Sequence, residues 1–231
     1  MKLFDRFSKR SATTPTSAPV QQYTGSGNFV DDLVNYFSSQ PEVNAAYFGF
    51  AYNSMAKQYQ LYLVVDHDGE AETIADPTWM IKSAHMSDTD IQYASPARSG
   101  DMLEYISQHN PPFYHKENSA LLQQKVMKQW FDVTKYKQEL IDTLKASKVF
   151  TLAYEYEKPS DRFSFATYVR DTGEFIPLFS HQDMIAKSGI SEIPTGRLAV
   201  QLPFEMISKM LGREQFFILN PGTPFEVELH V

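Results

Sequence analysis

Apolar residues recur at helical spacing directly after the polar stretch that opens the chain. Asn28 suits the cap of a helix, and Asp31 and Asp32 follow in the first turn, where they complement the helix dipole. Pro41 would end the helix. The apolar residues between these limits lie at intervals of three and four: Phe29, Val30, Leu33, Val34 and Phe37. The pattern predicts an amphipathic helix.

Two runs dense in aromatic and β-branched residues come next, AAYFGFAY at 45–52 and YQLYLVVD at 59–66. A short polar link joins them, so they predict an antiparallel hairpin in a sheet that is covered on both faces. After a DHDGE turn, the spacing predicts a helix over 77–86, a strand over 91–95 and a helix over 102–107. The prolines of NPPFYHK then end this first unit.

The second half begins with two predicted helices, one over 119–131 and one capped by Thr134. The run VFTLAYEYE (149–157) then alternates apolar and polar positions, with Phe150, Leu152, Tyr154 and Tyr156 on one side. RFSFATYVR (162–170) alternates in the same way after the turn KPSD. This pattern predicts a hairpin with one buried and one solvated face.

The end of the chain predicts a short helix and two strands. In LPFEMISKMLG (202–212), Pro203 suits a first helical turn and Gly212 suits a C-cap. The apolar run FFILN and the alternating EVELHV read as strands. Each half thus has the order helix, hairpin, helix and further strand, which is a weak internal repeat.

We therefore expect an α/β (α+β) protein of two similar modules. Each module should hold a mostly antiparallel or mixed sheet with flanking helices. The predicted boundaries are a flexible leader at 1–28, a first module at 29–116 and a second module at 117–231. The leader is rich in Ser, Thr, Pro and Gly and has no apolar period, so ordering it would not be offset by burial.

The tripeptide Asn220-Pro221-Gly222 is the most distinctive turn signal. Proline fixes φ and glycine accepts positive φ, so the tripeptide suits a type II turn that returns FFIL onto EVEL. A ligand loop is the alternative, because exposed N–H groups of such a turn bind anions. Glu226 and Glu228 nearby argue against that alternative. We also expect Ser180 to cap a helix that contains Met184 and Ile185.

Composition excludes several classes of protein. The chain has no cysteine, which excludes disulfides, thiolate nucleophiles and cysteine-bound metals and is typical of a cytoplasmic protein. No apolar run approaches the roughly 20 residues of a membrane span, and no secretory signal is apparent. MKLFDRFSKR at residues 1–10 would place Leu3, Phe4 and Phe7 on one side of a helix; peripheral membrane contact is an alternative to a disordered tip.

Charge is distributed unevenly along the chain. The formal charge is −7; residues 1–28 carry four bases against Asp5, which is +3 and leaves −10 for the remainder. A negative body repels nucleic acid and favours a basic protein partner. The lysines of 125–137 are expected on solvated helix faces.

No residue set spells out a catalytic or metal site, so we expect no cofactor. Asp66-His67-Asp68-Gly69 lacks the spacing of a calcium loop and reads as a turn. Gly25-Ser26-Gly27-Asn28 follows no strand and reads as linker. His109 and His115 are the histidines that could act as bases, but no orienting carboxylate is identifiable. Zinc-protease, P-loop and serine-elbow motifs do not occur.

Short motifs in the second half resemble the SseB protein family. The family's core domain has a strand ending in P-[LV]-F-[ST] and a late NPG turn, matched here by Pro177, Leu178, Phe179, Ser180 and by Asn220, Pro221, Gly222. The first half, with PEVNAAYFGFAY, LYLVVD and PPFY, is similar to the companion SseB C-terminal-type domain. The companion-type module comes first here, the reverse of the usual arrangement. The resemblance implies a fold and, through the family name, a link to serine sensitivity; it implies no defined mechanism.

Together these patterns predict a non-enzymatic protein that binds another protein, with an adaptor- or immunity-type role toward a basic partner. The alternative is a small-molecule binder or enzyme that uses the cleft between the modules, promoted by convergence of His109, His115 or Asp66. The candidate binding residues are aromatic and turn residues: Tyr52, Tyr62, Tyr168, Phe113, Tyr114, Asn220 and Gly222. If the aromatic residues form an exposed patch, that patch would be the interface.

Overall fold

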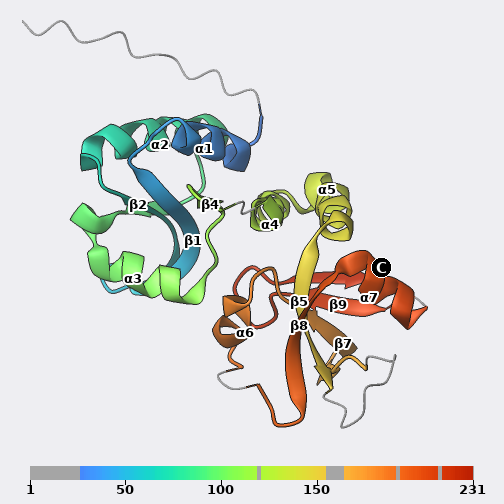
Figure 1. Ribbon diagram of the computed structural model, residues 1–231. Helices are drawn as coiled ribbons and strands as arrows, with labels where there is room; N and C mark the ends of the chain where they lie inside the picture. The colour runs from blue at the N-terminus through green and yellow to red at the C-terminus, as the bar shows by residue number, and fades with distance from the viewer. Residues whose placement is uncertain (1–26, 119–120, 155–163, 191–192, 213–214, 231) are drawn as a thin grey trace, which may run out of the picture.

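The computed structural model describes residues 27–118, 121–154, 164–190, 193–212 and 215–230 (Figure 1). The predicted leader, apart from its last two residues, and the KPSD turn lie outside these ranges. Within them, no helix is long and apolar enough to cross a membrane.

The first module is a four-stranded mixed sheet with strand order β3-β2-β1-β4. The predicted hairpin is confirmed: β1 and β2 pair antiparallel, with Phe48 opposite Leu63, while β2 and β3 run parallel. The elements of this module are α1 (Phe29–Ser38), β1 (Val43–Asn53), β2 (Gln58–His67), α2 (Ala71–His85), β3 (Ile91–Ala94), a 3₁₀ turn (Pro96–Arg98), α3 (Gly100–His109) and β4 (Tyr114–His115).

Helices cover both faces of this sheet. Helices α1 and α2 lie over one face and α3 over the other (Figure 1). Asn28 caps α1 as predicted, because its side chain accepts hydrogen bonds from the N–H groups of Val30 and Asp31. Gly49 lets α3 approach closely: a Cβ there would lie 2.7 Å from Ile106. This close packing fixes the C-terminal end of α3 against the sheet.

The second module contains a four-stranded sheet, β10-β9-β7-β6, and a two-stranded sheet, β5-β8. Strands β7 and β9 are parallel, and the other pairs are antiparallel. Its elements are α4 (Leu121–Phe131), α5 (Val133–Ala146), β5 (Lys148–Tyr154), β6 (Tyr168–Arg170), β7 (Gly173–Leu178), α6 (Asp183–Lys187), β8 (Arg197–Pro203), α7 (Phe204–Leu211), β9 (Phe216–Leu219) and β10 (Val227–His230). The two-module α+β architecture with mixed sheets is thus confirmed.

The hairpin predicted from 149–157 and 162–170 is described only in part, because residues 155–163 lie outside the described ranges. Strand β5 pairs along its full length with β8, a strand that the sequence did not predict, and β6 pairs with β7. Within the described ranges, the two predicted strands meet at an antiparallel bridge between Ala153 and Phe165, where the Ala166 N–H donates to the Leu152 carbonyl. Both faces of β5 are largely buried. Thr151, which the alternation placed on the solvated face, is buried, and its hydroxyl donates to the Pro177 carbonyl.

Three helix starts also differ from the prediction. Helix α2 begins at Ala71, with Pro77 inside it. Asp132, not Thr134, caps α5, since its side chain accepts from the Lys135 N–H group. Helix α6 begins after Gln182, because the N–H and hydroxyl of Ser180 bond to Asn220 instead.

The two modules share one hydrophobic core across α4. On the first-module side, Phe131 packs edge-on against Phe29, with ring centroids 5.2 Å apart. On the other side, Trp130 lies between Phe50 of β1 and Phe225 of the last loop, at 6.0 and 5.5 Å. Helix α4 therefore binds the modules together, and their facing surfaces are held in a defined arrangement.

Candidate functional site

A polar cleft lies where the two modules meet. It has a volume of about 690 Å³, in the range of ligand pockets. Both modules contribute to its lining: Tyr47, Ser107, Pro111, Pro112 and His115 from the first, with Asn118, Leu122, Gln123, Ser180, His181, Asp183, Met184 and Lys187 from the second. A smaller hollow of about 390 Å³ also has His115 and Asn118 in its wall, so the two hollows are neighbours.

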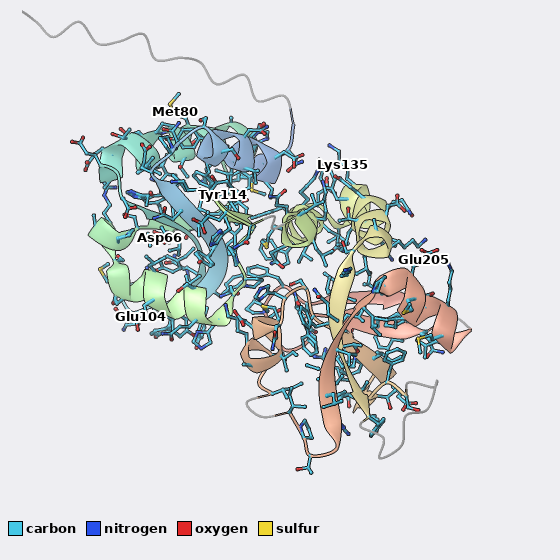
Figure 2. The ribbon with its side chains drawn as sticks, in the orientation of Figure 1. Asp66, Met80, Glu104, Tyr114, Lys135 and Glu205 are labelled. Atoms are coloured by element: carbon cyan, nitrogen blue, oxygen red, sulfur yellow. The ribbon has the colours of Figure 1, made fainter. Side chains whose placement is uncertain are left out.

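A carboxylate, Asp66, lies near His115 of the first-module wall but is not among the residues that line either hollow. Ala45 on β1 pairs with Asp66 on one side and with His115 on the other. Figure 2 labels Asp66 within this module and Tyr114, the neighbour of His115, on the side nearer α4. Burial, followed by the charge of Asp68, raises the pKa of Asp66, while His67 and His115 oppose that rise. Burial and then the charge of Asp66 raise the pKa of Tyr47. The negative charge of Asp66 therefore acts on Tyr47 and His115, which line this wall.

Lys187 of α6 joins the two modules at the cleft. Its ammonium donates to the carbonyls of Ser107 and Asn110, at 2.7 and 3.0 Å, at the C-terminal end of α3. This end of a helix carries partial negative charge and attracts cations. Burial lowers the pKa of Lys187, partly offset by the charge of Asp183. No carboxylate of the described residues forms an ion pair with Lys187.

The second-module wall is positioned by Asn220, which is buried. Its side-chain oxygen accepts from the Ser180 N–H at 2.9 Å, and its amide nitrogen donates to Ser180 Oγ and to Gln123 Oε1. Its backbone N–H donates to the Leu178 carbonyl. The P-L-F-S segment and the NPG turn thus meet directly behind the cleft.

The predicted NPG turn has the expected form. Gly222 has φ of +77°, and the Thr223 N–H bonds to the Asn220 carbonyl, as a type II turn requires. Asn220 itself has φ of +51°, which the sequence did not predict. The Gly222 N–H donates to the Glu226 carboxylate at 2.8 Å, and Arg170 holds Glu226 through two hydrogen bonds. Because Glu226 occupies this N–H group, the turn offers little to an external anion.

The predicted aromatic residues do not form one exposed surface. Tyr52 is 54% exposed and packs against Tyr59, with ring centroids 5.6 Å apart at the hairpin tip. Tyr62 is buried under α3, so its assignment as a surface binding residue is corrected. Tyr168 lies in the second module, where Arg197 donates to its hydroxyl and covers its ring.

The remaining predicted residues support the fold or the cleft from behind. Phe113 is fully buried and stacks on Phe48, and the Tyr114 hydroxyl donates to the Phe37 carbonyl. Both are core residues because β4 seals the sheet beside α1. Gly222 abuts the end of α6, where an added Cβ would lie 2.8 Å from the Ser188 carbonyl. Asn220 and Gly222 therefore act on the cleft through Ser180 and α6.

The histidines named from the sequence are separated. His115 lines the cleft, whereas His109 bonds to the Tyr105 carbonyl and stacks on the Tyr105 ring. The sequence did not predict Gln123, His181 or Lys187 as cleft residues. Gln123 and Lys187 lie in helices with ordinary polar patterns, so the sequence signals for this region were His115 and the match of Ser180 and Asn220 to family motifs.

Among the described residues of the cleft, the hydrogen bonds of Ser180 do not pair it with a histidine base. Ser180 precedes His181 in the chain, but its hydroxyl bonds to Asn220. His181 Nδ1 instead accepts from the Asp183 N–H at 3.3 Å. Within the part of the chain that the structure describes, no three His, Asp or Glu side chains gather as a metal site. In the 66–69 turn, His67 bonds to the Gly69 carbonyl.

Fold and site define a two-module α+β protein with a polar cleft between its modules. The family model of the SseB protein C-terminal domain matches residues 17–116, and that of the SseB protein N-terminal domain matches residues 124–231. The chain belongs to the SseB family, with the C-terminal-type domain first, as the motifs predicted. No curated protein and no solved structure matches the chain.

Proposed function

We propose that this SseB-family protein is a non-enzymatic binding protein that holds a segment of a partner protein in the cleft between its modules. One observation carries the proposal: both modules line a cleft of about 690 Å³, and a second hollow adjoins it at His115 and Asn118. Clefts between domains are common binding sites, and two neighbouring hollows suit an extended segment.

The charge distribution favours a basic partner. Residues 29–116 contain twelve Asp and Glu against four Lys and Arg, a balance of −8, whereas residues 117–231 contain fifteen against thirteen, a balance of −2. The negative potential is therefore concentrated on the first module. Such a potential attracts basic protein surfaces and repels nucleic acid. An adaptor- or immunity-type protein would use a surface of this kind.

The proposal is tested by filling the cleft at an exposed position. Asn118→Trp places an indole between the two hollows, and Gln138→Trp makes the same kind of change on an exposed part of α5. Each full-length variant is used to capture partners from native extract at low and physiological salt, with quantification by mass spectrometry. We expect a stoichiometric partner that salt weakens, retained by Gln138→Trp and reduced about tenfold or more by Asn118→Trp.

Two outcomes would count against this function. Equal capture by both tryptophan variants would place the partner elsewhere on the protein. Absence of any stoichiometric partner at low salt would contradict protein binding itself.

A small-molecule ligand in the larger hollow is the second candidate. The observation that favours it is the set of polar side chains from both modules that converge there, including Lys187 and Gln123. An NMR titration of the full-length chain with small carboxylates and their amides tests this candidate.

A further inference from the structure

The larger hollow contains an ammonium group that is not fully used by the protein. Lys187 has three N–H donors, and two of them go to the carbonyls of Ser107 and Asn110. Lys187 lines the hollow and has no carboxylate within ion-pairing distance among the described residues. A partly buried cation of this kind is stabilised by an anionic oxygen that occupies its remaining donor.

Gln123 presents a second donor in the same hollow, and the hydrogen bonds determine its orientation. The Ser180 N–H can only donate, so the group of Asn220 that it meets is the oxygen. The Asn220 side-chain nitrogen then donates to Gln123, so the acceptor must be the side-chain oxygen of Gln123. The Gln123 nitrogen consequently faces the other way. Gln123 is only 4% exposed, and this nitrogen has no protein partner in the described ranges.

The two histidines of the hollow are also arranged as donors. His115 Nδ1 accepts from the Glu117 N–H at 3.1 Å, and His181 Nδ1 accepts from the Asp183 N–H. A neutral imidazole that accepts at Nδ1 carries its proton on Nε2. Both rings therefore offer an Nε2–H group that can donate to an acceptor in a ligand.

Negative charge at the edges of the hollow limits the ligand to a small charge. Asp183 is 71% exposed beside His181, and Asp66 lies near His115, behind the lining of the opposite wall. These carboxylates would oppose a polyanion such as phosphate. A single carboxylate group satisfies the donors with the least repulsion.

We propose that the larger hollow is a carboxylate-binding subsite in which Lys187 and Gln123 bind the oxygens of a ligand carboxylate. The inference rests on the proposed role of the cleft as a binding site and names the group that it recognises. Two sources supply this chemistry, a small carboxylic acid or the C-terminal carboxylate of a protein segment.

The test is an NMR titration of the ¹⁵N-labelled full-length chain with defined probes. Acetate and N-acetyl-trialanine carry the carboxylate, whereas acetamide and N-acetyl-trialanine amide are their uncharged controls. We expect amides of 107–118 and 180–188 and the Gln123 side chain to shift with the acids, and affinity to fall about tenfold or more with the amides. A peptide acid that binds tenfold more tightly than acetate would identify a chain end, and equal affinities would identify a small acid.

Variants link the binding to Gln123. Gln123→Glu keeps an oxygen for Asn220 but turns a negative oxygen toward the hollow, so we expect carboxylate affinity to fall about tenfold or more. Gln129→Glu makes the same change on α4 outside both hollows and should leave affinity unchanged. Circular dichroism confirms that each variant is folded.

Three results would overturn the inference. They are that no carboxylate probe shifts these amides, that the amide probes bind as well as the acids, or that Gln123→Glu binds acetate with wild-type affinity. The experiments distinguish a failure of this inference from a failure of the proposed function. Partner capture that Asn118→Trp abolishes, with no carboxylate binding, would remove only the subsite. Carboxylate binding without a cleft-dependent partner would leave only the small-molecule candidate.

Discussion

Asn220 shows what a single turn residue contributes beyond its backbone shape. The sequence predicted the turn correctly from proline and glycine chemistry, but local chemistry says nothing about side-chain partners 40 and 97 positions away, Ser180 and Gln123. The same limit explains why Lys187 was not anticipated: its role depends on two carbonyls at the end of a helix in the other module.

Replacing Asn220 separates its two roles. Asn220→Ala leaves the Ser180 N–H and the Gln123 oxygen without partners. It also places alanine at a positive φ, which alanine tolerates less well than asparagine does. We expect a loss of about 3 kcal/mol of unfolding free energy. Asn220→Gly removes the same hydrogen bonds but relieves the backbone strain, so it should lose about 1 kcal/mol less. Urea unfolding measures both. Wild-type stability for Asn220→Ala would contradict a structural role for the motif.

Among the secondary-structure elements, periodicity predicted the β1–β2 pairing of the first module because these two strands are neighbours in sequence, but it did not predict β4, which pairs with β1 from the other end of the module. The β1–β2 hairpin and the Asn28 cap are local features, and both are confirmed. The pairing of β5 with β8 was not predicted, because β8 lies more than 40 residues further along the chain. Alternation in a single strand identifies a strand but does not identify its partner.

The loop from β9 to β10 depends on a carboxylate, which gives its stability a pH dependence. The hydrogen bonds from Arg170, and then from the Gly222 N–H, lower the pKa of Glu226 below its ordinary value of 4.5, despite partial burial. A lowered folded-state pKa means that the contribution is fully present above pH 4.5 and is lost as pH falls through the folded-state value.

Glu226→Gln should therefore lower stability near neutral pH by about 1 kcal/mol and reduce the fall in stability between pH 5 and pH 3. Urea unfolding across that range tests the effect. Glu228→Gln is the matched control, an exposed residue two positions away on β10 with no hydrogen bond to the turn. Identical pH profiles for wild type and Glu226→Gln would refute the assignment.

At the scale of the whole molecule, the modules are joined by a common core rather than by a linker. The sequence predicted two units from their repeated plan, and the family domains match in the same reversed order. It did not predict that α4, assigned to the second module, packs its Phe131 against Phe29 of the first. Composition and periodicity locate helices, but the choice of packing partner depends on surface shape. The cleft is a product of that packing, so sequence patterns alone could only raise it as an alternative.

Hydrogen–deuterium exchange of the full-length protein, with and without its captured partner, tests the central claim most directly, namely that ligands bind between the modules. We predict slower exchange on both walls at once, over 107–116 of the first module and over 180–188 of the second. Protection confined to the Tyr52–Tyr59 hairpin tip or to the acidic 66–76 segment, with both walls unchanged, would contradict it.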